Sequence, residues 1–234
     1  MKVELISWTN NPVDTVASAA SVCYDSEPDE KIVKQCLNSG HHSVVEHMNF
    51  TFRIEGVSRA LTHQLVRHRI ASYSQRSQRY CSEDGAGMVV PPSIEKNLVA
   101  VQIYKEALNY IQDIYKELQK YVPNEDARFI LPNACETTIY VTMNMRTLMH
   151  FMNERLCTRA QWEIQKMAQL MKKAIKEKQS EMNLDDSSME LILNNLVPKC
   201  EAGKIKFCPE HKSCGRQKTA QEIKNILQAY SILH

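Results

Sequence analysis

Residues 48–69 read Met48-Asn-Phe-Thr-Phe-Arg-Ile-Glu-Gly-Val-Ser-Arg-Ala-Leu-Thr-His-Gln-Leu-Val-Arg-His-Arg69. Apolar side chains alternate with polar ones up to Ile54, which is typical of a half-buried strand, and Gly56 is expected to end that strand. Ser58 is a good N-cap, and the apolar positions after it predict a helix to about Arg67. The stretch therefore predicts a strand followed directly by a helix that ends in a cluster of cations.

The rest of the chain extends this pattern in both directions. Strands are expected at 2–8 and 136–143, helices at 12–24, 29–37, 93–121, 146–156 and 160–178, a helical turn at 126–130, and an extended loop or sheet edge at 72–80. These elements do not alternate as βαβ units. We expect an α+β fold, a single domain over 1–195 with a mixed or antiparallel sheet flanked by long helices. A polar tail with cysteines and a histidine follows over 196–234.

Composition excludes several classes of protein. The 234 residues are 43% hydrophobic and 24% charged, which is ordinary globular usage and argues against wholesale disorder. No apolar run approaches the roughly 18 residues of a membrane span, and the first residues do not resemble a signal peptide. We expect a cytoplasmic protein whose eight cysteines are reduced thiols.

The charge is distributed unevenly although its net value is only +2. Residues 56–82 contain no acid and no lysine, but they contain Arg59, Arg67, Arg69, Arg76 and Arg79. Because no acid within this segment neutralises them, we expect these guanidiniums to hold an anion such as a phosphate. A solvated basic helix end is the alternative. An RNA-binding loop that stacks bases on Tyr73 and Tyr80 is another, although the remainder of the chain is mildly acidic.

Three separate blocks of sequence resemble one known family. Arg67-His68-Arg69, followed by Ser72, Ser77 and Arg79, is similar to the signature of the flavin-dependent thymidylate synthases. The segment Gly40-His-His-Ser-Val-Val-Glu-His47 resembles the upstream block of that family. Residues 144–155 and 160–164 resemble its C-terminal block. No Walker or Rossmann phosphate loop is present in the sequence, so a flavin would be held by a different architecture.

The resemblance implies an enzyme that methylates dUMP reductively to dTMP. In that reaction 5,10-methylenetetrahydrofolate donates the carbon, FAD reduced by NADPH is the reductant, and tetrahydrofolate is released. The resemblance also implies a homotetramer in which FAD lies between subunits, so that one site draws residues from several chains. It implies neither a nucleic acid nor a membrane as partner.

The resemblance also assigns residues. Arg155 is implied to be catalytic, because a guanidinium beside N3 and a carbonyl oxygen of the pyrimidine favours the N3 anion. The implied dUMP contacts are Gln64, Leu65, Val66, Arg67, Gln75, Arg76, Ser77, Gln78, Arg79, Arg128 and Arg155. The implied FAD contacts are Ser43, Arg67, His68, Arg69, Gln75, Asn144, Met145, Arg146 and His150, with His41 and Glu46 as further neighbours. Gln75 stands where relatives often carry glutamate, and His150 where some carry asparagine.

Two groups of residues raise the question of a metal. His41, His42, Glu46 and His47 do not fit His-Glu-x-x-His or His-x-x-Glu-His, so a metal-dependent hydrolase is not expected there. Cys200, Cys208, His211 and Cys214 supply four soft ligands for a structural zinc, but they contain no Cys-x-x-Cys pair. Plain reduced thiols are the alternative, and we expect no metal.

Overall fold

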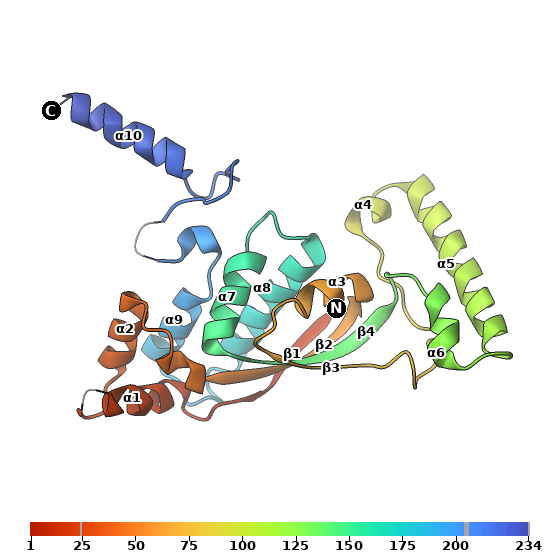
Figure 1. The fold of residues 1–234 in the computed structure, drawn as a ribbon, viewed down its shortest axis with the longest axis horizontal. Coiled ribbons are helices and arrows are strands. Elements are labelled where there is room, and N and C mark those ends of the chain that lie inside the picture. The colour runs from red at the N-terminus through yellow and green to blue at the C-terminus, as the bar shows by residue number, and fades with distance from the viewer. Residues whose placement is uncertain (24, 204–205, 234) are drawn as a thin grey trace. The chain divides into compact units, whose positions relative to one another are not determined.

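A four-stranded sheet joins the parts of the chain that are far apart in sequence. The computed structural model describes residues 1–23, 25–203 and 206–233. The strand order is β1-β2-β4-β3, with β1 over Lys2–Trp8, β2 over Asn49–Ser58, β3 over Ser72–Gln75 and β4 over Glu136–Asn144 (Figure 1). Backbone N–H groups of Met145 and Arg59 donate to the carbonyl oxygens of Met48 and Cys135, at opposite ends of β2, so β2 and β4 are antiparallel. The predicted α+β class is confirmed.

Strand β2 carries the alternation that the sequence predicted. Phe50, Phe52 and Ile54 are all fully buried, and the residues between them are only partly covered. The strand does not end at Gly56, so that expectation was wrong. Gly56 instead has φ of 66°, and a Cβ there would lie 3.2 Å from the backbone nitrogen of Met1. Glycine is needed inside this strand because the backbone turns to positive φ where another segment approaches closely.

The chain divides into two compact units, and the first comprises Met1–Lys2 and Arg53–Val141. Its helical elements are α3 over Arg59–Leu65, α4 over Pro92–Glu95, α5 over Leu98–Leu118, α6 over Asn124–Ala127 and a 3₁₀ turn over Arg128–Ile130. One long helix was expected over 93–121. The structure has two helices there, because Asn97 is extended and its side chain accepts a hydrogen bond from the Ala100 N–H, which starts α5.

The second unit comprises Val3–Phe52 and Thr142–His234. It contains α1 over Pro12–Val22, α2 over Glu30–Ser39, α7 over Met145–Arg155, α8 over Trp162–Glu177, α9 over Asp186–Asn195 and α10 over Ala220–Leu233, with 3₁₀ turns over Val44–His47 and Lys199–Glu201. Helices α7 and α8 contact each other (Figure 1). Tyr24, the expected end of the first helix, lies outside the described residues. Helix α9 was not predicted. No helix in the described ranges has the length and apolar character needed to cross a membrane.

Candidate functional site

The Arg67-His68-Arg69 triplet forms a turn at the end of α3, in the first unit. The helix begins at Ser58, whose hydroxyl accepts a hydrogen bond from the Leu61 N–H at 3.0 Å. It ends where the N–H groups of Arg67 and His68 bond back to the carbonyls of Gln64 and Leu65. Leu61 and Leu65 are fully buried and fix the helix to the core, whereas the side chains of Arg67 and Arg69 are exposed. Neither arginine has an ion pair among the described residues, so both guanidiniums are available to an anion.

Tyr73 on β3 holds this turn in place. Its hydroxyl oxygen lies 2.9 Å from the Leu65 carbonyl oxygen and 2.7 Å from the His68 carbonyl oxygen. A neutral phenol donates its proton there, whereas a phenolate would repel both oxygens. Burial raises the pKa of Tyr73 to about 12, so the donor form persists at neutral pH. The side chain therefore connects the strand to the turn that carries the two free arginines.

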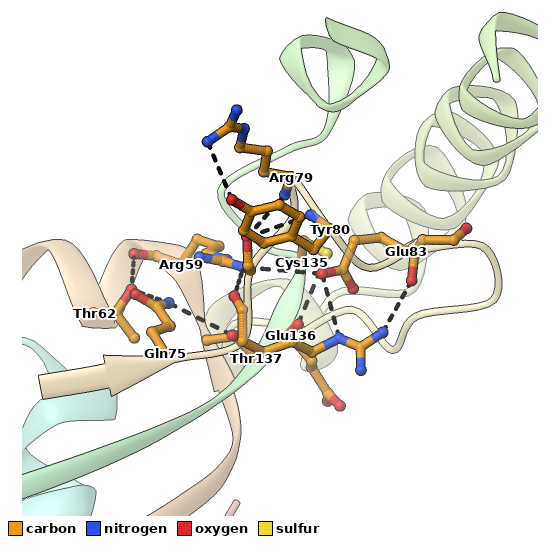
Figure 2. A network of polar contacts seen from close by, with 12 residues as sticks. Arg59, Thr62, Gln75, Arg79, Tyr80, Glu83, Cys135, Glu136 and Thr137 are labelled. Atoms are coloured by element: carbon orange, nitrogen blue, oxygen red, sulfur yellow. Dashed lines mark hydrogen bonds and ion pairs between the residues drawn. The ribbon is translucent and has the colours of Figure 1, made fainter. Parts of the chain in front are cut away.

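Gln75, at the end of β3, is fixed by its amide nitrogen. That nitrogen donates to the Thr62 hydroxyl at 3.0 Å, and the Thr137 hydroxyl lies 3.5 Å away (Figure 2). An ionised carboxylate accepts hydrogen bonds but cannot donate one. Glutamine therefore makes a contact with Thr62 in which the nitrogen is the donor, and a glutamate at this position would require the threonine to donate instead.

The five arginines of the acid-free segment are not all free, which corrects the expectation that nothing neutralises them. Glu83, the first acid after the segment, is 2% exposed, and its Oε1 lies 3.9 Å from Arg59 Nη2 (Figure 2). The same oxygen lies 3.5 Å from Arg76 Nε. Burial raises the pKa of Glu83 although the two guanidiniums act to lower it. Burial likewise lowers the pKa of Arg59. One buried carboxylate thus forms ion pairs with two of the five arginines.

Arg79 and Arg128 meet at a single residue of α6. Arg79 Nε lies 2.5 Å from Glu125 Oε2, and Arg128 Nε donates to the Glu125 backbone oxygen at 3.0 Å. Ser77 accepts a hydrogen bond from the Arg79 N–H at 3.2 Å, which makes it a turn residue. The neighbouring Gln78 has a buried amide nitrogen that lacks a hydrogen-bond partner. The structure thus places the dUMP residues expected between 64 and 79, together with Arg128, in the first unit.

The remaining expected residues belong to the second unit. Asn144 is the N-cap of α7, and its side-chain oxygen accepts from the Thr147 N–H at 2.9 Å. Arg146 and His150 are exposed and lie one turn apart on α7. Arg146 Nη1 lies 2.6 Å from Glu46 Oε1, which joins α7 to the upstream block. Ser43 and His41 are exposed just before the 3₁₀ turn that carries Glu46.

Two of the expected contact residues have side chains that a ligand does not reach. Leu65 is 0% exposed, and Met145 is 1% exposed with its N–H already bonded to Met48. A ligand contact at either residue would involve the backbone alone. Val66, between Leu65 and Arg67, is 40% exposed. Arg155 is the last residue of α7 and is partly exposed.

Arg155 lines a cavity of about 260 Å³ in the second unit that contains four cysteines. These are Cys157, Cys200, Cys208 and Cys214. The sequence had grouped His211 with the last three, whereas Cys157, from the turn after α7, takes that place around the cavity. Among the residues that the structure describes, no three His, Cys, Asp or Glu side chains are placed to coordinate a metal ion.

The comparisons with known proteins agree with the motifs. A model of the family described as "Thymidylate synthase complementing protein" matches residues 4–179. A flavin-dependent thymidylate synthase of Clostridium tetani is 41% identical, covering 97% of this chain and 96% of its own length. One from Geobacter sulfurreducens is 42% identical over 99% of this chain and 100% of its own. This chain belongs to the flavin-dependent thymidylate synthase family. The resemblance inferred from the motifs is confirmed.

A solved structure supports the same fold for this synthase. Thymidylate synthase X from Helicobacter pylori, crystallised with FAD and dUMP, is 23% identical and superposes with a TM-score of 0.63, covering 81% of this chain and 99% of that one. A second Helicobacter pylori structure with FAD and dUMP is 25% identical, with a TM-score of 0.61. The mixed helix and antiparallel sheet architecture is therefore that of the family.

Sequence reasoning about this synthase missed three residues that shape the arginine segment. Tyr73 was considered only as a surface for stacking bases, whereas its hydroxyl holds the Arg67–Arg69 turn. Glu83, the first acid after the segment, and Glu125 on α6 were given no role in the sequence analysis, although they pair with Arg59, Arg76 and Arg79. The available signal for Glu83 was its position: an acid that closes an arginine-rich segment is close enough in sequence to fold back onto it.

Proposed function

We propose that this synthase converts dUMP to dTMP, with 5,10-methylenetetrahydrofolate as carbon donor and NADPH as the source of reducing equivalents for bound FAD. The observation that carries the proposal is the pair of exposed guanidiniums, Arg67 and Arg69, that have no ion pair among the described residues. They stand in the family's signature and on a turn that Tyr73 holds fixed. Two unpaired arginines on a fixed turn are suited to phosphate oxygens.

The groups that would hold dUMP line the segment after β3. The Arg76 N–H is bonded to the Thr138 carbonyl at 3.0 Å, which fixes the start of the loop to the sheet. Arg79 is held only weakly by Glu125, because their ion pair is exposed and such a pair contributes little to stability. An entering phosphate therefore competes with Glu125 at modest cost. Arg128 shares the same partner residue and adds a second guanidinium nearby.

The residues present fit a flavin. Its diphosphate requires cations, and Arg67, Arg69 and Arg146 supply them from exposed positions. His150 and Asn144 add polar groups on the same helix as Arg146. When bound, FAD supplies the reducing equivalent that turns the transferred methylene into a methyl group. The protein's part is to bind and orient the reactants.

Arg155 is proposed to act on the pyrimidine. A guanidinium is always charged, and its planar fork matches an N3 atom and the adjacent carbonyl oxygen. By placing a positive charge there, Arg155 lowers the pKa of the N3 proton and stabilises the anion that makes C5 a better nucleophile. No cysteine of the chain is needed as a nucleophile in this scheme.

An absorbance spectrum tests the proposal. The purified protein, or the protein given FAD and freed of excess by gel filtration, is expected to show a bound flavin that NADPH bleaches, and dUMP is expected to accelerate the bleaching. Formation of dTMP from labelled dUMP is the second measurement. A protein that remains colourless after incubation with FAD, or that binds an oligonucleotide in place of the flavin, would contradict the proposal.

A further inference from the structure

Glu83 stands out in the first unit as a buried acid that is not among the expected ligand contacts. Its side chain is 2% exposed and faces the guanidinium of Arg59, which is 17% exposed (Figure 2). It also pairs with Arg76, which is 46% exposed. Its Oε1 has no hydrogen-bond partner, and Arg59 Nε is likewise buried without one. The contacts of Glu83 with the two guanidiniums are ion pairs at 3.9 and 3.5 Å. Removal of the carboxylate would leave two cations facing each other, one of them largely buried.

The backbone of Glu83 is fixed from the opposite side. Its N–H donates to the hydroxyl of Tyr115 at 3.2 Å, and its carbonyl accepts from the Ala86 N–H at 3.0 Å. Tyr115 is fully buried on α5. The backbone of Glu83 is thus bonded to a buried side chain of a 21-residue helix.

The two arginines carry this rigidity to the loop at residues 76–79. Arg59 Nη2 donates to the Arg76 carbonyl oxygen at 2.6 Å, and Arg76 Nη2 donates to the Ser82 carbonyl oxygen at 2.9 Å. The Arg76 N–H is bonded to the Thr138 carbonyl of β4. Both backbone polar groups of Arg76 are therefore held, and the carbonyl is held by an arginine whose charge Glu83 balances.

We propose that Glu83 is a positioning residue of the nucleotide site, which fixes Arg76 and the backbone of residues 76–79 so that they bind the phosphate of a nucleoside monophosphate. Glu83 does not itself touch the nucleotide. The inference rests on the proposed function, since it concerns the loop expected to hold dUMP. Glu83 is negatively charged, yet it is expected to favour binding of an anionic ligand because it acts through two cations, Arg59 and Arg76.

Charge alone predicts the opposite effect, which makes the inference easy to test. Replacing Glu83 by glutamine removes one negative charge and so raises the net charge near the loop by one. If only the electrostatic field mattered, dUMP would bind more tightly. If Glu83 positions the arginines, dUMP binds more weakly in spite of the added charge. We expect the Kd for dUMP to rise about tenfold or more in Glu83→Gln, the loss typical of a charge-assisted contact.

The experiment measures dUMP binding to FAD-loaded protein by titration calorimetry, beside steady-state kinetics. In Glu83→Gln, KM for dUMP should rise with Kd, kcat at saturating dUMP should fall less than about threefold, and FAD content should be unchanged. Asp84→Asn is the matched control. It removes a charge from the adjacent residue, whose carboxylate pairs with Lys116 at 2.9 Å and with no arginine in the part of the chain that the structure describes. It should leave the Kd unchanged.

Two further variants separate positioning from general loss of structure. Glu83→Asp keeps the charge at a longer distance and should give an intermediate Kd, and it remains informative if Glu83→Gln fails to fold. In an Arg76→Ala background, Glu83→Gln should have a smaller effect, because the two residues act through one contact. Unchanged or tighter dUMP binding by folded Glu83→Gln would overturn the inference. If only Glu83→Asp folds, the same result with that variant would overturn it. In either case, dUMP binding by the wild type leaves the proposed function standing. A wild type that does not bind dUMP would overturn both.

Discussion

At the scale of single residues, the hydroxyl of Tyr73 makes a specific contribution that pH reveals. The folded-state pKa of about 12 lies above the ordinary value of 10, because burial disfavours the phenolate. The unfolded chain therefore releases this proton first as pH rises. The stabilisation is fully present below about pH 10 and is lost as pH increases toward 12, by at most about 2 kcal/mol after allowance for partial exposure.

Tyr73→Phe should remove both the hydrogen bonds and this alkaline dependence. We expect the free energy of unfolding to fall by about 1 kcal/mol at pH 8, and FAD to bind more weakly because the Arg67–Arg69 turn loses its support. Urea unfolding from pH 8 to 11 measures the first effect and flavin fluorescence the second. Tyr121→Phe, at a position 76% exposed, is the control. Equal pH dependence in wild type and Tyr73→Phe would contradict the assignment.

Arg155 calls for a test that separates chemistry from binding. Arg155→Ala should retain bound FAD and its reduction by NADPH, while dTMP formation at saturating dUMP falls about 10²–10³-fold, the cost of losing one preorganised donor to a developing anion. Arg155→Lys should restore activity only in part, since an ammonium lacks the planar fork. Normal turnover in Arg155→Ala, or joint loss of flavin reduction and methylation, would count against this role.

The sequence identified the arginines of the first unit but not what surrounds them. A guanidinium is recognisable in a sequence, and five of them without an intervening acid indicate an anion site. The ion-pair partners of these arginines depend on which segments of the chain meet in space. Glu125 lies 46 residues from Arg79 in sequence, and the contact of the Tyr73 hydroxyl with backbone carbonyls has no sequence signal. Arg67 and Arg69 are exposed. The ion pairs of Arg59 and Arg76 had only the position of Glu83 as a signal, and the pair of Arg79 with Glu125 had none.

At the scale of elements, Asn144 has two separable roles. It caps α7, and it is expected to contact FAD. Asn144→Ala should cost about 1 kcal/mol of stability through the lost bond to the Thr147 N–H, and should also weaken FAD binding. Asn97→Ala, which removes the equivalent cap of α5, should cost a similar amount without affecting the flavin. Thermal unfolding and FAD titration of both variants measure this. Equal FAD affinity in the two would leave Asn144 as a cap only.

Most elements were predictable because their signals are local. The cap at Ser58 and the buried alternation of β2 each follow from a few neighbouring residues. The incorrect predictions concern elements whose conformation depends on a segment that is distant in sequence. Gly56 continues the strand because Met1 lies against it, and the missed helix α9 has its polar Ser188 near Glu30, which is 158 residues away in sequence. Asn97 was overlooked because apolar residues continue on both sides of it.

At the scale of the whole molecule, helix α5 presents an apolar stripe that one chain does not cover. Val99, Ile103 and Tyr110 are 69%, 63% and 68% exposed. At about 100° per residue these positions fall within about 40° of one another. Periodicity indicated the helix, but it could not distinguish a face buried within the chain from one left for a partner. We propose that a second copy of the chain covers this stripe, in the homotetramer that the family resemblance implies.

Breaking this contact should therefore affect assembly and flavin binding together. Ile103→Glu places a charge in the stripe, and desolvating that charge in an apolar interface is costly. We expect the wild type to sediment as a tetramer, and Ile103→Glu to dissociate to smaller species that retain less FAD. Gln102→Glu adds the same charge at an exposed position beside the stripe and should leave both properties unchanged. Analytical ultracentrifugation with flavin absorbance detection follows mass and cofactor in one experiment. A wild-type monomer that binds FAD would refute a site shared between subunits, and an Ile103→Glu tetramer would place the interface elsewhere.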